Sequence, residues 1–270
     1  MPTSDTAFTG SIPELYDSLL VPMIFQPYAR DIAARVAALA PAAVLETAAG
    51  TGVVTRTLAP LLGTTARYVA TDLNQPMLDR AIGQQPKGHP VEWTQADALA
   101  LPFADASFDV VLCQFGVMFF PDRIAGYKEA LRCLTPGGTF LFNAWDRIDT
   151  NEFANVATRA VAEFFPDDPP DFMARTPHGY NDTARIAADV RAAGFRSVAI
   201  HTVTLASTAD TPHRAARAYC QGTPLRFEIE KRNASALTEV TDRATAALQA
   251  RFGPGPITGS LQAHVVIAGA

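Results

Sequence analysis

The chain has 270 residues and a formal net charge of −5, and 48% of its residues are hydrophobic. This length and composition allow a globular protein to bury a sizeable core without disulfides or a structural metal. Nucleic-acid binding needs clustered basic residues, so the acidic balance and the absence of any Lys/Arg run argue against such a partner. The apolar runs fall short of the ~18 residues of a membrane span, so we expect a soluble, cytoplasmic protein.

The cysteines point to no covalent framework. The three of them, Cys113, Cys133 and Cys220, are widely separated and none stands in a C-x-x-C pair. An odd count with this spacing fits neither a disulfide scaffold nor a zinc site. We therefore expect free thiols and no metal site.

The predicted elements begin with two helices, residues 12–25 and 27–39, separated at Pro27. A short apolar strand follows at 43–46, then a glycine-containing loop and a helix at 53–62. The pattern predicts further strands at 67–71, 91–95, 108–113 and 139–143, with helices at 75–83 and 123–134. Beyond these we predict helices at 151–165, 182–193, 212–219 and 227–252, a proline-rich loop at 166–180, and strands at 197–205 and 261–268.

Strands that are apolar on both faces and alternate with helices indicate a mostly parallel sheet covered on both sides. Right-handed crossovers then favour a doubly wound α/β fold, here a seven-stranded Rossmann-like sheet. We expect lid helices in residues 1–40 and a core in residues 41–145. Residues 182–206 and 258–270 complete this core, and the insertions 146–181 and 207–257 form a cap over the substrate pocket.

Acidic side chains recur where successive strands end. Glu46, Asp72 and Asp97 each lie at or just past a predicted strand's carboxyl end, where ligands bind in open α/β sheets. Gly50 and Gly52, in the loop after Glu46, lack side chains, so backbone N–H groups can approach a ligand closely. Three carboxylates at this edge favour a cationic, hydroxyl-rich ligand over a phosphate.

The same residues suit a nucleoside. Asp72 can accept both hydroxyls of a ribose, and charge-assisted hydrogen bonds of this kind contribute about 1.5–3 kcal/mol each. Asp97 can accept a hydrogen bond from an exocyclic amine. No lysine follows the glycine loop, so a nucleoside triphosphate would lack its usual phosphate partner.

Five blocks of sequence carry a family resemblance. Residues 44–55, 71–78, 95–103, 107–111 and 134–138 resemble, in order, the motifs of class I S-adenosylmethionine-dependent methyltransferases. The likeness is strongest to the ubiquinone/menaquinone-biosynthesis-like branch. It implies a direct displacement, in which an O, N, S or carbon nucleophile attacks the sulfonium methyl group, and it leaves these four nucleophiles open.

The resemblance also implies roles for individual residues. Glu46 and the backbone of residues 48–52 would hold the methionine part of the cofactor, and Gln114 would line the sulfonium side. Ala48 departs from the glycine that many members carry there, so we expect a slightly different backbone approach. The nucleoside end would be bound by Asp72 at the ribose, Leu73 and Met77 at the adenine faces, and Asp97 and Ala98 at the adenine amino edge.

The acceptor side is less defined by the sequence. Tyr16, Tyr28, Phe119 and Trp145 are candidates to line an apolar or aromatic substrate pocket, although aromatic residues at helical spacing are more often core. Among the five histidines, His178 and His213 fall in the cap segments, where a general base could act. The others read as structural or surface residues.

Two other functions share parts of this pattern. A NAD(P)-dependent oxidoreductase also has a glycine loop and an acid ending the second strand, but Glu46 beside the loop would repel a pyrophosphate. A non-catalytic relative that only binds a ligand is the second alternative. We expect a small-molecule substrate in either enzyme, and the sequence leaves a homodimer open.

Overall fold

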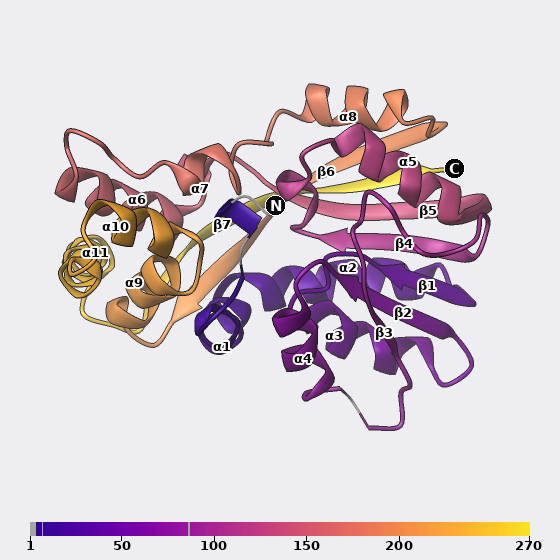
Figure 1. The fold of residues 1–270 in the computed structure, drawn as a ribbon, viewed down its shortest axis with the longest axis horizontal. Coiled ribbons are helices and arrows are strands. Elements are labelled where there is room, and N and C mark those ends of the chain that lie inside the picture. The colour runs from indigo at the N-terminus through magenta and orange to yellow at the C-terminus, as the bar shows by residue number, and fades with distance from the viewer. Residues whose placement is uncertain (1–3, 7, 86) are drawn as a thin grey trace. The chain divides into compact units, whose positions relative to one another are not determined.

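The computed structural model describes residues 4–6, 8–85 and 87–270. Within them the strands form one sheet of seven in the order β3-β2-β1-β4-β5-β7-β6 (Figure 1). Strands β1 to β5 pair in parallel, and β7 runs antiparallel to β5. The strands are β1 (Ala43–Glu46), β2 (Arg67–Asp72), β3 (Glu92–Gln95), β4 (Phe108–Gln114), β5 (Leu134–Trp145), β6 (Ser197–Ala209) and β7 (Ile257–Gly269). The predicted doubly wound α/β class is confirmed.

Helices connect most of the strands. The α-helices are α1 (Ile12–Leu15), α2 (Gln26–Ala38), α3 (Val53–Leu62), α4 (Gln75–Ile82), α5 (Arg123–Cys133), α6 (Glu152–Phe164), α7 (Phe172–Arg175), α8 (Thr183–Ala192), α9 (Pro212–Gln221), α10 (Leu225–Arg232) and α11 (Leu237–Phe252). A π-helix, η2, spans Tyr16–Phe25, and short 3-10 helices are η1 (Ser4–Thr6), η3 (Val117–Phe119) and η4 (Ile148–Thr150). None of the helices in the described residues is long and apolar enough to cross a bilayer.

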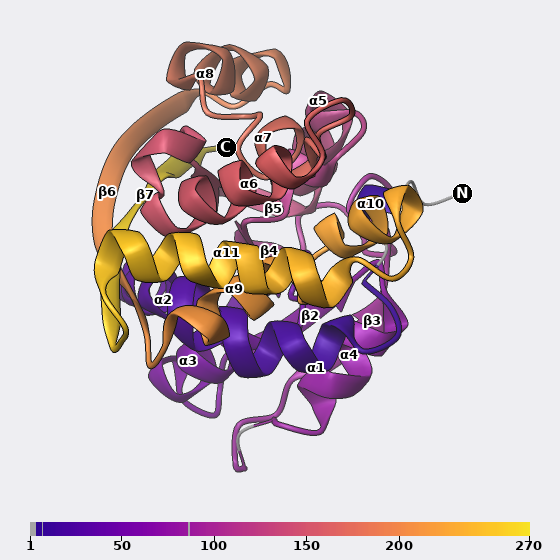
Figure 2. The same cartoon turned by 90° about the vertical axis from the view of Figure 1, so that its left-hand side faces the viewer.

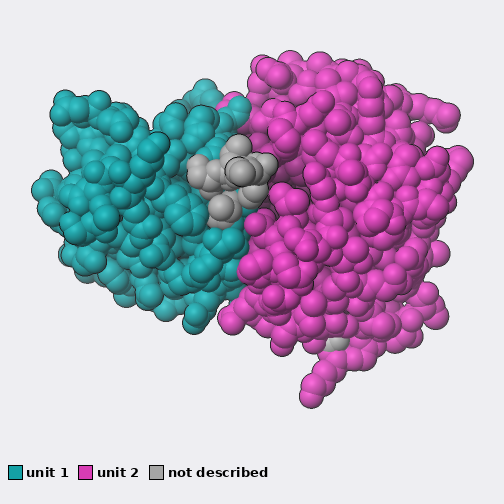
Figure 3. All heavy atoms as spheres, in the orientation of Figure 1, with its two compact units in different colours: residues 1–27, 146–179, 204–262 teal, residues 28–145, 180–203, 263–270 magenta. Residues whose placement is uncertain are grey.

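The chain divides into two compact units, coloured separately in Figure 3. Unit 1 comprises residues 1–27, 146–179 and 204–262, and unit 2 comprises residues 28–145, 180–203 and 263–270. Residues 1–3 and 7 of the predicted lid segment 1–40 lie outside the described residues.

In unit 2 the two faces of the sheet differ in chemistry, because successive side chains of a strand point to opposite faces. On one face Tyr127 of α5 stacks on Phe142 with ring centroids 5.2 Å apart, and Phe140 stacks on Phe195, which follows α8. The opposite face carries polar side chains near the strand ends. Glu46 of β1 lies there and receives a hydrogen bond from α3.

In unit 1 the long helix α11 lies alongside α6 and α9 (Figure 2). Its buried residues Val240, Ala244 and Leu248 recur every four positions, so one stripe of the helix faces its neighbours. Helix α9 begins at Thr211, whose side chain accepts a hydrogen bond from the backbone N–H of Arg214. These helices therefore form a small core of their own.

The helical prediction was wrong in two places: a predicted break is absent and an unpredicted one is present. Residues 12–38 form one continuous helical run through α1, η2 and α2, without the predicted separation at Pro27. Pro27 therefore lies inside the run, two residues after η2 ends at Phe25, and does not end the helix. The predicted helix 227–252 is instead α10 and α11, because Asn233 turns the chain between them and accepts hydrogen bonds from the N–H and hydroxyl of Ser235.

Other boundaries also differ from the prediction. Strand β5 begins directly after α5 at Leu134, earlier than the predicted 139–143, and so includes the Pro-Gly-Gly stretch 136–138, with a register shift against β4. The predicted loop 166–180 contains the short helix α7. Strands β6 and β7 are longer than the predicted 197–205 and 261–268, because each continues from unit 2 into unit 1.

Candidate functional site

The loop after β1 is held by backbone hydrogen bonds on both of its sides. The N–H of Thr47 donates to the carbonyl of Leu112 on β4, and the N–H of Ala49 donates to that of Thr71 on β2, both at 2.9 Å. Between these bonds Ala48 adopts a φ of 52°, and the loop continues through Gly50 at 58°. Left-handed values are rare for a side chain with a Cβ, so the loop conformation is imposed by its neighbours.

Gly52 closes the loop as the N-cap of α3, with a φ of 80°. A Cβ at this position would lie 3.0 Å from Cβ of Ala81 and 3.2 Å from the ring of Trp93. Both the backbone conformation and the packing of α3 on α4 therefore require glycine here. Position 52 thus requires glycine for structural reasons, whether or not the loop contacts a ligand.

Asp72 joins the loop to the end of β2. Its Oδ2 accepts a hydrogen bond from the N–H of Gly50, and its Oδ1 accepts one from the N–H of Asn74, both at 2.8 Å. Burial raises the pKa of this carboxyl, and the backbone hydrogen bonds oppose that rise. The side chain of Asn74 and the N–H of Leu73 also lower the pKa of Asp72 through hydrogen bonds, so four protein groups act on this carboxylate.

Glu46 is buried below the loop with 1% of its surface exposed. Its Oε2 accepts hydrogen bonds from the hydroxyls of Thr55 at 2.6 Å and Tyr68 at 2.5 Å. Burial raises the pKa of Glu46 to about 7, although the two hydroxyls act in the opposite direction. A group with this pKa is shared between its acid and carboxylate forms near neutral pH.

The nucleoside-side candidates lie around the ends of β2 and β3. Leu73, directly after Asp72, is 45% exposed, which is unusual for a leucine beside a buried carboxylate. Met77 is buried on α4. Asp97 is exposed and its Oδ1 accepts a hydrogen bond from the N–H of Leu99 at 2.9 Å, and Ala98 is half-buried. An apolar platform therefore adjoins the acid that we expect to bind a ribose.

One further polar atom fits a ligand at this loop. The hydroxyl of Thr51 is buried, and it has no hydrogen-bond partner among the residues that the structure describes. Leaving such a group unpaired costs about 1–3 kcal/mol. An unpaired hydroxyl, a buried carboxylate at the end of β2 and an uncovered leucine together fit a polar nucleoside cofactor such as S-adenosylmethionine.

Aromatic rings gather at the carboxyl ends of β4 and β5. Phe115 stacks on Trp145 with centroids 3.6 Å apart, and Tyr28 of α2 meets both rings edge-on. The hydroxyl of Tyr28 donates to the carbonyl of Val203 at 2.7 Å. Gln114, the last residue of β4, and Phe119 of η3 are half-buried.

The remaining candidates belong to unit 1. His178 is buried, and its Nδ1 lies 2.7 Å from the backbone carbonyl of Asp146, the residue after β5. Burial lowers the pKa of His178 to about 4. His213 is exposed on α9, with Nδ1 3.4 Å from the hydroxyl of Thr245. Tyr16 is half-buried and stacks on Phe25 with centroids 4.7 Å apart.

The sequence reasoning missed three residues that shape this region. Thr55 and Tyr68 hold Glu46, and Phe115 stacks on Trp145. Tyr68 could have been noticed as a polar residue in an otherwise apolar strand. Its pairing with Glu46 depends on the register of β1 against β2, which sequence periodicity does not give.

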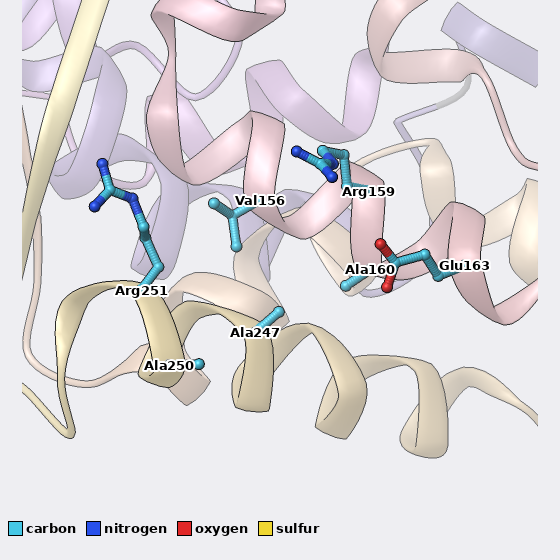
Figure 4. A pocket seen from close by; sticks show the side chains of 7 residues that line it. All are labelled: Val156, Arg159, Ala160, Glu163, Ala247, Ala250 and Arg251. Carbon is cyan, nitrogen blue, oxygen red and sulfur yellow. The ribbon is translucent and has the colours of Figure 1, made fainter.

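A separate groove lies between α6 and α11 in unit 1 (Figure 4). It has a volume of about 350 Å³, and its lining combines small residues with charged ones: Ala160, Ala247, Ala250, Arg159, Glu163 and Arg251. None of these resembles a group that we expect to act in methyl transfer. Within the described residues no three His, Cys, Asp or Glu side chains gather in a way that could hold a metal ion.

A mostly parallel α/β sheet with an acid ending β2 beside a glycine-containing loop defines a nucleoside-binding α/β protein. Comparison with known proteins narrows this class. Residues 45–142 match the family described as "Methyltransferase domain". The ubiquinone/menaquinone biosynthesis C-methyltransferase UbiE of Ectopseudomonas mendocina is 32% identical over 174 residues, which are 60% of this chain and 68% of that protein. The chain thus belongs to the class I S-adenosylmethionine-dependent methyltransferases, in the ubiquinone/menaquinone-biosynthesis-like branch.

Solved structures show the same fold. The YcgJ protein of Bacillus subtilis has a TM-score of 0.55 at 21% identity, covering 88% of this chain and 97% of its own. Phosphoethanolamine N-methyltransferase 2 of Haemonchus contortus, solved with S-adenosylhomocysteine, has a TM-score of 0.52 at 17% identity, covering 84% of this chain and 48% of its own. The predicted family, fold, enzyme class and cofactor are confirmed.

Proposed function

We propose that this methyltransferase transfers the methyl group of S-adenosylmethionine to a small apolar or aromatic acceptor. The observation that carries the proposal is the likeness to a C-methyltransferase of ubiquinone/menaquinone biosynthesis, 32% identical over 174 residues. Tyr28, Phe115 and Trp145 form an aromatic cluster at the carboxyl ends of β4 and β5, but their rings are only 0–5% exposed, so they would support an acceptor pocket from behind and not contact the acceptor directly. The name of the relative in Ectopseudomonas mendocina, a C-methyltransferase of quinone biosynthesis, supports a ring as the acceptor.

The cofactor would be held by unit 2. Asp72 accepts the ribose hydroxyls, Leu73 and Met77 pack on the adenine, and Asp97 and Ala98 face its amino edge. Glu46 and the loop 48–52 receive the methionine part, with Gln114 on the sulfonium side. In support, the hydroxyl of Thr51 has no partner among the described residues and the side chain of Leu73 is uncovered. The cofactor supplies an electrophilic methyl group on sulfur.

The protein's contribution to the reaction is positioning and, for an acceptor that carries a proton, its removal. Binding two partners in line at ~3–3.5 Å supplies most of the acceleration of such displacements. We assign the general base to His178. Its Nδ1 faces a carbonyl, which can only accept, so this nitrogen carries the ring proton and Nε2 is the basic one.

The cofactor, held by the residues of unit 2 named above, would supply its methyl group as an electrophile to the acceptor's lone pair. The acceptor's proton passes to Nε2 of His178 and then to solvent. Burial lowers the pKa of His178 to about 4, so the ring is neutral at physiological pH and is a weaker base than an exposed histidine. His213, exposed on α9, lacks a comparable setting.

A product assay tests the proposal. The full chain is incubated with S-adenosylmethionine and a panel of phenols, quinols, aliphatic amines and thiols, and methylated products are identified by mass spectrometry. We expect phenols or quinols to be methylated in preference to small hydrophilic amines. Methylation restricted to amines would contradict the acceptor class. Parallel titrations with S-adenosylhomocysteine and NADH should show binding of the first only, and bound cofactor without any product would favour a non-catalytic binding protein.

A further inference from the structure

Gly116 is a glycine for reasons of space. It lies in the turn after β4 with a φ of −101°, a conformation that any residue adopts. A Cβ built on it would lie 2.5 Å from Cβ of Ala48 and 2.7 Å from Sγ of Cys113. Neither neighbour is the far end of a flexible side chain, so one of the two backbones would have to move.

Ala48 is unusual in the opposite way, because its backbone favours glycine but the residue is alanine. Its left-handed φ of 52° favours glycine, yet it carries a methyl group. The backbone on either side of Ala48 is fixed by the hydrogen bonds of Thr47 to β4 and of Ala49 to β2. The methyl group therefore has a fixed position, and it occupies the space that a side chain at position 116 would need.

The turn that contains Gly116 is itself constrained. Phe115 has a φ of 55°, and its N–H donates to the carbonyl of Asn143 on β5 at 3.2 Å. The carbonyl of Gly116 accepts a hydrogen bond from the N–H of Phe119 at 3.0 Å. The methyl group of Ala48 on the β1 side thus faces the place on the β4 side where Gly116 carries no side chain.

We infer that Ala48 and Gly116 are a size-matched pair of positioning residues that sets where the β1 loop stands for the methionine end of the cofactor. The inference rests on the proposed cofactor site. A larger residue at 116 pushes the β1 loop away from β4 and also presses on Sγ of Cys113, and removing the methyl group of Ala48 relieves the first of these two contacts. The pair is coupled, so neither substitution can be understood alone.

A double-mutant cycle tests the pair with Gly116→Ala, Ala48→Gly and the variant that carries both. S-adenosylhomocysteine and adenosine are titrated calorimetrically into each protein, below its unfolding temperature. We expect Gly116→Ala to weaken S-adenosylhomocysteine binding at least about tenfold, since small displacements of a positioned group cost this much or more. The double variant should bind S-adenosylhomocysteine more tightly than Gly116→Ala alone, because the contact with Ala48 is gone while that with Sγ of Cys113 remains.

Adenosine separates positioning from general damage, because it lacks the methionine end. Its affinity should be unchanged in all three variants. The inference is overturned if Gly116→Ala binds S-adenosylhomocysteine like the parent, if the double variant is not rescued, or if adenosine binding falls in parallel. A separate arm, Asp72→Ala, tests the nucleoside site: unchanged affinity there would refute the proposed cofactor site, whatever the outcome of the cycle.

Discussion

Replacing Glu46 by glutamine should remove a large part of the pH dependence of stability. Burial raises the pKa of this carboxyl from 4.5 to about 7 in the folded chain. The folded state therefore binds the proton more tightly than the unfolded state. The resulting stabilisation is fully present below pH 4.5 and is lost as the pH rises through 7.

The magnitude follows from the two pKa values. Each pKa unit corresponds to about 1.4 kcal/mol, and integrating over both titrations gives a loss of about 2.5 kcal/mol of unfolding free energy between pH 5 and pH 8. Glutamine keeps an oxygen that can accept from Thr55 and Tyr68 but does not titrate. Glu46→Gln should therefore lack this fall.

Urea unfolding at pH 5, 6, 7 and 8 measures the effect. The slope of the unfolding free energy against urea concentration should be the same at each pH. Glu163→Gln, the same substitution at an exposed site on α6, is the matched control and should follow the parent at every pH. The reasoning is refuted if Glu46→Gln loses as much stability as the parent between pH 5 and pH 8.

Four further substitutions test separate contacts or serve as controls. Asp72→Ala should weaken S-adenosylhomocysteine binding at least about tenfold by removing a charge-assisted acceptor; unchanged affinity would remove Asp72 from the site. His178→Asn should lower kcat about 100-fold or more without changing the cofactor KM, and the parent rate should stay flat above pH 6 because the pKa of His178 is about 4. His213→Asn, the matched control, should leave kcat and the cofactor KM unchanged. Tyr28→Phe should lower the unfolding free energy by about 1–2 kcal/mol, since the carbonyl of Val203 loses its donor; equal stability would show that the bond contributes nothing.

The sheet could be predicted from sequence because its signals are local. A run such as 67–72 is apolar, ends in an acid and is followed by a helix, and each of these features lies within a few residues. The positions of Asp72 and Glu46 at strand ends follow from the same pattern. This is why the fold class and the edge of the sheet that carries the acids were predicted together.

The contacts of these acids could not be predicted in the same way. Tyr68 reaches Glu46 from a neighbouring strand, and Gly116 meets Ala48 across 68 positions of chain, so both contacts depend on register and turn geometry. The break between α10 and α11 escaped the prediction for a related reason. Residues 227–252 have helix-forming composition, and a single side-chain turn at Asn233 overrides it.

Ionisation of the buried Glu46 carboxyl lowers the stability of the free protein near neutral pH, and an opposite charge on a ligand would offset this loss. The methionine end of the cofactor carries an ammonium group, and an opposite charge nearby favours the ionised form of Glu46. Binding of S-adenosylhomocysteine should then expel the proton that Glu46 shares near pH 7.

This last prediction is measured by calorimetry in buffers of different ionisation enthalpy. With a free-state pKa of about 7, about half a proton per bound ligand should be released at pH 7, and less at pH 8 where Glu46 is already ionised. Glu46→Gln should bind without this release. A binding enthalpy that is independent of the buffer in the parent would mean that the carboxyl does not interact with the ligand's charge, and that Glu46 serves only to tie β1 to Thr55 and Tyr68.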